Sequence, residues 1–383
     1  MNFKPNRISF SAKRAFPDTL WYVCLLALLI PVFLGHFPAE TVLAAQPLVY
    51  ASSLCAYALL AFKIFFRDEH TLAELAVMGF WLLCAALCTV FSGNRCFLST
   101  FLLVFSAKGL NFEKLCRVFF WFFLSTLLLN LLLVAAGILE DTVTIRWEAI
   151  NHGKPRHSLG FGYANTLGFW TVLLIFSALL YFRKKHRIAA AVGALLFAVC
   201  VFLITDSKAA LLASCAAALL CLAAILFGEK LSSRKWSIPL CLGLYLLGIL
   251  VFLTLSLLYR EDNGFFRLCN QLLSDRLAYS GAAFHSIGVR LFGAHVNFGW
   301  DPVDSLYAYA PICLGIVPSL CYLGLNLYAL YRAARSGRWD IVAVFFAGAL
   351  YSTMEYGLLN PVHLPLFAAF AELEGTSAEK SSL

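Results

Sequence analysis

Six polar or ionisable side chains stand close to the ends of long apolar stretches of this chain. They are Arg156, Asn165, Asp206, Lys208, Asp304 and Glu355. Cations of this kind can neutralise anionic groups and carboxylates can take up protons, and such groups are costly and commonly functional at membrane depth. A single one could simply mark the point where a helix leaves the membrane. Because the apolar stretches place all six on one face, the group favours a functional site.

The elements that position these side chains must be membrane helices. Hydrophobic residues make up 61% of the 383 residues and charged residues only 13%, whereas a soluble globular protein has roughly 45–50% and about 25%. The chain therefore has too little polar surface to cover a soluble protein of its size. This composition excludes a cytosolic enzyme, a secreted domain, a disordered protein and a nucleic-acid binder.

Runs of about 20 apolar residues, the length that crosses a bilayer, divide the chain into twelve predicted spans. These are 20–36, 43–62, 72–92, 96–107, 116–138, 165–182, 188–205, 209–228, 237–258, 305–331, 341–357 and 361–375. The predicted fold class is all-α, a polytopic transmembrane helical bundle with about 12 spans, in which residues 1–383 form a single integral membrane domain. The fourth span is short and would need to tilt or to use the apolar stems of Arg95 and Lys108.

The distribution of positive charge predicts the orientation. With the N-terminus inside, most of the 29 lysines and arginines fall in short inner segments, as the positive-inside rule requires. The basic N-terminal segment resembles a signal sequence, but the many later spans favour a first span that stays in place. We therefore expect a multi-pass protein of the cell membrane with both termini cytoplasmic and the polar site facing outside.

Two predicted outer loops are long, residues 139–164 and 259–304, and neither is of low complexity, which favours a functional role. In the second loop, apolar residues recur at helical spacing from Phe265 to Tyr279. The pattern predicts a large extracellular loop that carries one amphipathic helix lying on the outer membrane surface.

The 13 cysteines lie mostly inside apolar runs, where cysteine behaves as a small hydrophobic residue. They form no Cys-x-x-Cys pair and no pattern typical of a disulfide framework or a metal site. Asp301 and Asp304 are the one pair of acids whose cooperation would suit a metal, and we do not favour it. The sequence therefore predicts no metal and no cofactor.

Three parts of the chain resemble the O-antigen ligase and polysaccharide polymerase superfamily, most closely the Wzy-type polymerases of Gram-positive capsules and exopolysaccharides. The first, Arg156–Gly168, is similar to the signature R-x-x-x-G-F-x-x-P/A-N-x-x-G. The second is an ordered set made of Asp275–Gly281, Gly288–Gly293, Val303–Tyr307 and Leu314–Ile316. The third is Glu355 with Asn360. The chain departs from the usual pattern at Ala164, Lys208 and His363.

The resemblance implies an enzyme that joins oligosaccharide repeat units carried on undecaprenyl diphosphate, at the outer face of the membrane. A sugar hydroxyl of one lipid-linked unit would attack the anomeric carbon of another, and undecaprenyl diphosphate would leave. A flippase and a chain-length regulator are the expected pathway partners. The site would have to hold a diphosphate, activate a hydroxyl and exclude water.

In that reaction, arginines would neutralise the diphosphate through their bidentate guanidinium groups. Arg156 is the first candidate, Arg276 the second and Arg290 the third. Lys208 would help as a point charge, and Asn165 belongs to the signature as a substrate-binding residue. The alternative for Arg156 is snorkelling at the membrane interface, and for Arg290 snorkelling is the favoured interpretation.

Asp304 is the favoured general base, because burial at the mouth of a span would raise its pKa, although it could equally serve as a helix N-cap. Tyr307, one helical turn further on, could hydrogen-bond to Asp304 or to a sugar. His285 and His295 compete through their intrinsic pKa, and Glu355 is a weaker candidate. Aromatic side chains could stack on sugars, but they also gather at membrane interfaces. These aromatic residues are Trp147, Tyr163, Tyr279, Trp300 and Tyr309.

Two other functions stay open at this point. A transporter of polysaccharide or lipid-linked oligosaccharide is one, since twelve spans fit many carriers. The chain shows neither repeated halves nor matched broken spans, and transport leaves the outer-surface helix without a role. The other is an O-antigen-ligase-type enzyme that transfers glycan to a different acceptor, which would share the site.

Overall fold

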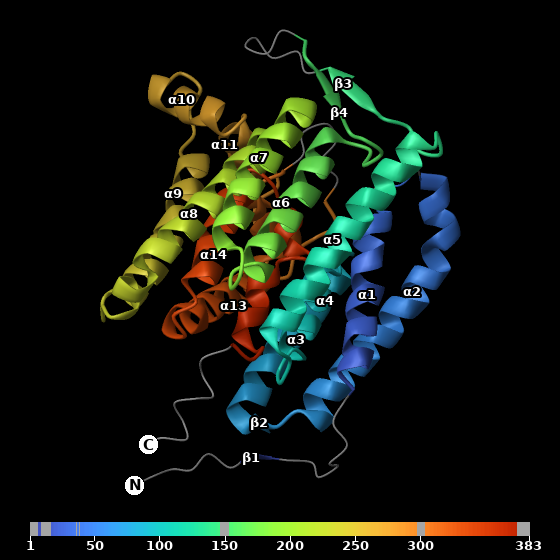
Figure 1. The fold of residues 1–383 in the computed structure, drawn as a ribbon, viewed down its shortest axis with the longest axis vertical. Coiled ribbons are helices and arrows are strands. Elements are labelled where there is room, and N and C mark those ends of the chain that lie inside the picture. Colours follow the sequence, from blue (N-terminus) through green and yellow to red (C-terminus); the bar gives the residue numbers. More distant parts are fainter. Residues whose placement is uncertain are drawn as a thin grey trace.

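The computed structural model describes residues 7–8, 17–35, 37, 39–145, 153–296 and 303–373. It is an all-α bundle (Figure 1), and by length and composition seven of the described helices could cross a membrane. These are the segment Ala45–Arg67, which comprises most of α2 (Ala39–Phe62) and a π-helical turn, α3 (Leu72–Ser92), α5 (Phe112–Ala135), α6 (Ala164–Tyr181), α7 (Arg187–Thr205), α8 (Lys208–Ser232) and α9 (Ser237–Leu257). The chain is thus built as a multi-pass membrane protein.

Shorter elements complete the bundle. The remaining α-helices are α1 (Asp18–Leu34), α4 (Cys96–Phe105), α10 (Gly264–Leu272), α11 (Arg276–Ser286), α12 (Leu306–Tyr309), α13 (Ile316–Arg335) and α14 (Trp339–Ser352). Two antiparallel strand pairs join β1 (Arg7–Ile8) to β2 (His70–Thr71) and β3 (Val143–Ile145) to β4 (Pro155–His157). The β3–β4 hairpin, α10 and α11 stand at one end of the bundle, here called the hairpin end, and β1 and β2 at the opposite end (Figure 1).

Five predicted spans are not among the seven long apolar helices. The spans at 20–36 and 341–357 are the shorter helices α1 and α14, of 17 and 14 residues. The span at 96–107 is the ten-residue α4. The span at 305–331 is broken into α12, a π-helical turn at Ala310–Leu314, and α13, because Gly315 has a φ of +97°. In the span predicted at 361–375, the described residues 361–373 form only a 3-10 turn, Leu364–Ala369. Proline provides the physical reason for the last difference, since it lacks the N–H that an α-helix needs.

The segment from Gly357 to Leu373 shows how such irregular backbone fits at membrane depth. It leaves the end of α14 and returns to the beginning of α5, where the backbone N–H of Phe112 donates to Glu372 O. Most of its side chains are buried among the helices. Non-helical backbone inside a membrane is tolerated where protein covers it, so this segment can cross without facing lipid.

The core of the bundle is built around α6. Its residues are buried on almost every side, from Ala164 to Leu180, whereas the other long apolar helices bury about a third of theirs or less. A helix that is apolar all round belongs in a protein interior. The outer helices expose large apolar side chains such as Val90, Leu203 and Leu226, which suits contact with lipid.

The described residues of the loop 259–304 contain two helices where one amphipathic helix was predicted. The chain breaks between α10 and α11 because Ser274 and Asp275 have φ values of +52° and +65°. On α10, Phe265 and Leu268 remain largely exposed, as expected for a helix lying on a membrane surface. The second helix, α11, packs instead on the end of α9.

A network of ion pairs occupies the opposite end of the bundle. Arg338 is buried, and its guanidinium donates to both carboxylate oxygens of Asp340 and, at 3.0 Å, to Glu113 Oε1. Arg183, just after α6, lies 2.6 Å from the same Glu113 oxygen. The network joins the beginning of α5, the end of α6 and the beginning of α14.

Candidate functional site

Five of the residues singled out in the sequence meet in one connected group at the hairpin end. Arg156 and Asn165 come from β4 and the first turn of α6, Arg276 is the first residue of α11, Asp304 precedes α12, and Glu355 follows α14. Four separate segments of the chain therefore contribute to what we call the Arg276 cluster, which consists of these five side chains. Six polar residues were predicted to share one face. Four of them belong to the cluster and are connected directly or through Arg276, namely Arg156, Asn165, Asp304 and Glu355.

Arg156 forms the first part of the cluster. In the β3–β4 hairpin it pairs with Thr144, and its side chain reaches the end of α7, where Nε donates to Thr205 O at 2.8 Å. The last carbonyls of a helix have no partner within the helix and carry partial negative charge. Its second group, Nη2, donates to Asn165 Oδ1 at 2.6 Å.

Asn165 connects this arginine to a carboxylate. The amide oxygen accepts from Arg156, and Nδ2 donates to Glu355 Oε1 at 3.1 Å. Close packing keeps this turn of α6 against the beginning of α8, because a Cβ at Gly168 would lie only 2.7 Å from Ser207 Oγ. The glycine three residues after Asn165 thus allows α8 to approach, and the motif spacing N-x-x-G has a structural reason.

Arg276 is the centre of the cluster and uses all three of its guanidinium nitrogens. Nη1 lies 2.6 Å from Asp304 Oδ2, Nη2 lies 3.5 Å from Glu355 Oε1, and Nε donates to Met354 O at 3.1 Å. The side chains of Arg276, Asp304 and Glu355 are 14–18% exposed. The group is therefore largely shielded but not completely buried.

The two carboxyl groups of the cluster have unusual proton affinities. Burial raises the pKa of Glu355 to about 8, with Asp304 adding to the rise and Arg276 opposing it. Burial also raises the pKa of Asp304, again against the influence of Arg276. Two acids that share one guanidinium cannot both ionise at low cost. Because Asp304 is the closer to Arg276, we assign the charge to Asp304 and the proton to Glu355 at neutral pH.

Asp206 and Lys208 lie beside the cluster, where α7 ends and α8 begins. Asp206 has a left-handed backbone, with φ of +49°, and ends α7. Lys208 begins α8, three residues after the carbonyl that Arg156 binds. Both side chains are partly buried, so the link supplies one further charge of each sign next to Arg156.

Four other predicted site residues lie away from the Arg276 cluster. Tyr307 does not reach Asp304, because its hydroxyl donates to Ala349 O at 3.2 Å and its ring lines an apolar cavity. His285 and Arg290 are exposed on and just after α11. His295 is exposed too, and its Nδ1 lies 3.3 Å from Ser92 O.

The predicted aromatic residues differ in exposure and in their contacts. Tyr163 is 72% exposed, which is typical of an interfacial residue. Tyr309 stacks on Tyr356, with ring centroids 4.4 Å apart and planes 12° from parallel. Tyr356 was not among the predicted site residues, although its position directly after the candidate Glu355 could have indicated it. The predicted residues Trp147, Trp300 and Asp301 lie outside the described part of the chain.

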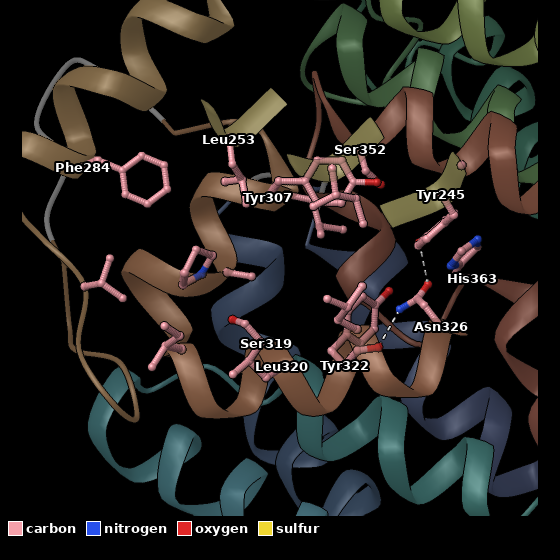
Figure 2. A pocket seen from close by; sticks show the side chains of 18 of the residues that line it. Tyr245, Leu253, Phe284, Tyr307, Ser319, Leu320, Tyr322, Asn326, Ser352 and His363 are labelled. Atoms are coloured by element: carbon pink, nitrogen blue, oxygen red, sulfur yellow. Dashed lines mark hydrogen bonds between the residues drawn. The ribbon is translucent and has the colours of Figure 1, made fainter. Parts of the chain in front are cut away.

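An apolar cavity of about 290 Å³ lies beside the cluster, between α9, α12 and α13. Leu306 and Tyr307, which closely follow Asp304 along the chain, line it. Figure 2 shows Phe284 and Leu253 on one side of the cavity and Tyr245 and His363 on the other. Its polar groups are few, and Asn326 takes part in hydrogen bonds with Tyr245 and with the backbone of Tyr322.

This cavity opens sideways from the bundle. Several of its lining residues, such as Leu257, Ile316 and Leu320, are also exposed on the outer surface of α9 and α13. An apolar opening on a lipid-facing surface suits an apolar chain better than a sugar. The cluster and the apolar cavity together make a site with one charged part and one apolar part.

No protein-family model, curated protein or solved structure matches this chain. In the described ranges, no group of three or more His, Cys, Asp or Glu side chains is arranged to hold a metal ion. The charged part of the site is instead made of two arginines, two carboxyl groups and an amide.

Proposed function

We propose that this protein is a membrane glycosyltransferase that polymerises oligosaccharide repeat units carried on undecaprenyl diphosphate. The observation that carries the proposal is the Arg276 cluster itself, in which Arg156 and Arg276 are joined through Asn165 and Glu355. Leu306 and Tyr307, which closely follow Asp304 of the cluster, line an apolar cavity. A lipid-linked diphosphate has an anionic group next to an apolar chain, and the site has the complementary order.

The orientation follows from the two ends of the bundle. The end opposite the cluster carries short basic segments such as residues 183–187, which the positive-inside rule assigns to the cytoplasm. The cluster then faces outside, where lipid-linked repeat units are assembled into polymer. We propose twelve crossings with both termini cytoplasmic. Seven are the long apolar helices, and the other five are α1, α4, the broken pair α12–α13, α14 and the segment after α14.

The reaction would proceed by displacement at the anomeric carbon of the donor. The acceptor hydroxyl oxygen forms the new glycosidic bond, and the bond from the anomeric carbon to the diphosphate oxygen breaks with its electron pair going to the diphosphate. Arg156 and Arg276 neutralise the leaving charge, so no general acid is needed. The hydroxyl proton passes to a carboxylate, and Asp304 is our first choice.

The resting contacts explain how Asp304 would become available as a base. Arg276 is bound to Asp304 at 2.6 Å, which neutralises both charges. A diphosphate would compete for the same guanidinium and leave Asp304 as an unpaired, partly buried carboxylate. Such a carboxylate has a raised proton affinity. The base would thus be activated when the donor is bound.

The proposal predicts a distinct phenotype for Arg156→Ala and Asp304→Ala in the producing cells. Both proteins should be inserted in the membrane at normal levels, yet polymer should fall by about 100-fold or more, the usual effect of losing a transition-state charge contact. Single lipid-linked repeat units should accumulate, as measured by extraction of the lipid fraction and mass spectrometry.

Arg267→Ala is the matched control, because it removes the same charge from exposed α10. It should leave polymer length and amount unchanged. Long polymer in both Arg156→Ala and Asp304→Ala would contradict the assignment of the site.

A further inference from the structure

A second cavity lies at the hairpin end on the other side of α12. It has a volume of about 480 Å³ and is lined by polar and aromatic groups from α2, the α3–α4 link, the segment after α11 and the π-helical turn that follows α12. We call it the Tyr309 cavity. Its principal side chains are Tyr50, Asn94, Arg95, His295 and Tyr309. Its volume lies within the range of roughly 300–1,000 Å³ that is typical of small-molecule sites.

The segment 304–314 separates this cavity from the apolar one. Leu306, Tyr307 and Ala310 line the apolar cavity, whereas Tyr309 and Cys313 line the Tyr309 cavity. Residues three or four apart share one face of a helix, so the two sets point to opposite sides. Asp304, a member of the Arg276 cluster, stands at the beginning of this segment.

The Tyr309 cavity is connected to the cluster by an aromatic pair. Tyr309 stacks on Tyr356, and Tyr356 directly follows Glu355. The stacked rings of Tyr309 and Tyr356 thus connect the cavity to Glu355 of the cluster.

The polar groups of the cavity are fixed in place. Asn94 Oδ1 accepts from the backbone N–H of Cys96 at 2.9 Å, and Nδ2 donates to the Tyr309 hydroxyl at 3.3 Å. The amide carries a second N–H, which leaves a donor for a ligand. The guanidinium of Arg95 lies over the ring of Tyr50, 4.5 Å from its centroid, which orients its in-plane N–H groups.

His295 adds an acceptor to these donors. Its Nδ1 lies 3.3 Å from the carbonyl oxygen of Ser92, and a carbonyl oxygen can only accept. The proton of the neutral imidazole is therefore on Nδ1, and Nε2 carries a lone pair. Together with the rings of Tyr50 and Tyr309, the cavity offers flat apolar faces, fixed donors and an acceptor.

We propose that the Tyr309 cavity binds the acceptor saccharide, the sugar whose hydroxyl attacks the donor. This inference rests on the proposed function. Sugars have apolar C–H faces and hydroxyl edges that both donate and accept, and this cavity offers a partner for each. In an in-line displacement the nucleophile approaches from the side opposite the leaving group. A donor with its lipid in the apolar cavity and an acceptor in the Tyr309 cavity would lie on opposite sides of the segment 304–314, which begins at Asp304.

The test uses the purified full-length protein with lipid-linked repeat units as donor. The acceptor probe is the lipid-free oligosaccharide released from the same material by mild acid. Arg95→Ala should raise the KM for the lipid-free acceptor by on the order of tenfold, with the KM for the donor and the kcat at saturating acceptor unchanged. Asn94→Ala should act in the same direction, and Arg267→Ala should change nothing. An unchanged acceptor KM in both cavity variants would overturn the proposal.

A binding measurement separates this inference from the proposed function. Saturation-transfer NMR with the lipid-free oligosaccharide should show binding to the unaltered protein and to Arg267→Ala, and loss of binding in Arg95→Ala. If that pattern is found while no lipid diphosphate is ever released, the cavity binds saccharide and the polymerase proposal fails. If lipid diphosphate is released but saccharide binding is the same in all three proteins, the cavity assignment fails.

Discussion

Arg276 is the residue on which the geometry of the site depends. It holds Asp304 at 2.6 Å, Glu355 at 3.5 Å and the carbonyl of Met354 at 3.1 Å. One guanidinium thus positions groups from both sides of the site. Asp304 is the carboxylate closest to the Arg276 guanidinium and balances its positive charge. Glu355 therefore keeps its proton, and the site without substrate carries no second, unbalanced negative charge.

This arrangement has a measurable consequence for stability. The pKa of Glu355 is raised from 4.5 to about 8 in the folded protein, so between these values the folded state binds more protons than the unfolded state. Stability therefore falls as pH rises from about 4.5 to about 8. Glu355→Gln keeps an acceptor for Asn165 and removes the titration. We expect its melting temperature in detergent to fall less between pH 6 and pH 9 than that of the unaltered protein.

Parallel melting curves for the two proteins over that pH range would contradict the assignment of the proton to Glu355. Glu261→Gln is a suitable control, since Glu261 is exposed between α9 and α10. It should follow the unaltered protein at every pH.

Sequence reasoning could identify most members of the site but not their contacts. Arg156, Asn165, Asp304 and Glu355 were recognisable because polar groups are rare beside apolar spans. Tyr307 stands one turn from Asp304, which predicted a contact, yet its hydroxyl bonds to Ala349 O. The direction in which a helix presents a side chain depends on its neighbours in the fold, and α9 and α14 lie too far along the chain for local spacing to reveal them.

At the scale of elements, the position of α11 determines where Arg276 lies. The helix begins at Arg276 because the chain turns at Ser274 and Asp275, and it rests on the end of α9 through Gly281. A Cβ at that position would lie 2.4 Å from the carbonyl oxygen of Ser256. The predicted single helix across this region missed the break, since apolar spacing continues through it while the backbone does not.

Gly281→Ala should therefore move α11 away from α9 and displace Arg276. Overpacking of this kind costs about 1–3 kcal/mol, which a bundle of this size should withstand. We expect a folded protein with polymerising activity reduced by about tenfold or more, since small misplacements of catalytic groups have large effects. The rate of lipid diphosphate release and the melting temperature measure the two parts of this prediction.

Gly264→Ala provides the control, because it adds the same methyl group at the beginning of α10, where no atom lies within 4 Å. Its activity should equal that of the unaltered protein. Full activity in Gly281→Ala would show that the packing of α11 on α9 does not position the site.

At the scale of the whole molecule, the bundle has two ends with different charge arrangements. Composition predicted a multi-pass membrane protein. The seven long apolar helices and the exposed apolar side chains around them confirm this prediction. Seven of the twelve predicted spans are long apolar helices. The prediction counted apolar residues and took no account of the breaks that Gly315, Pro361 and Pro365 introduce. A segment with a broken backbone that is covered by protein can be as apolar as a continuous membrane helix, so composition does not distinguish the two.

The proposed orientation can be tested with single cysteines at exposed positions. A thiol reagent that does not cross membranes should label Arg267→Cys in intact cells and should label Lys185→Cys only after permeabilisation. The comparison needs the unaltered protein as background, because the chain has 13 cysteines. Labelling of position 185 but not position 267 in intact cells would invert the orientation and place the Arg276 cluster inside.

The most direct measurement of the central claim is polymerisation by the purified protein. It is reconstituted in vesicles with lipid-linked repeat units alone, without nucleotide sugars, and the products are separated by size. We predict polymer of many repeat units together with one released lipid diphosphate for each bond formed, and a reduction by about 100-fold or more in Arg276→Ala. Repeat units that stay single, or polymer formed equally well by Arg276→Ala, would contradict the account.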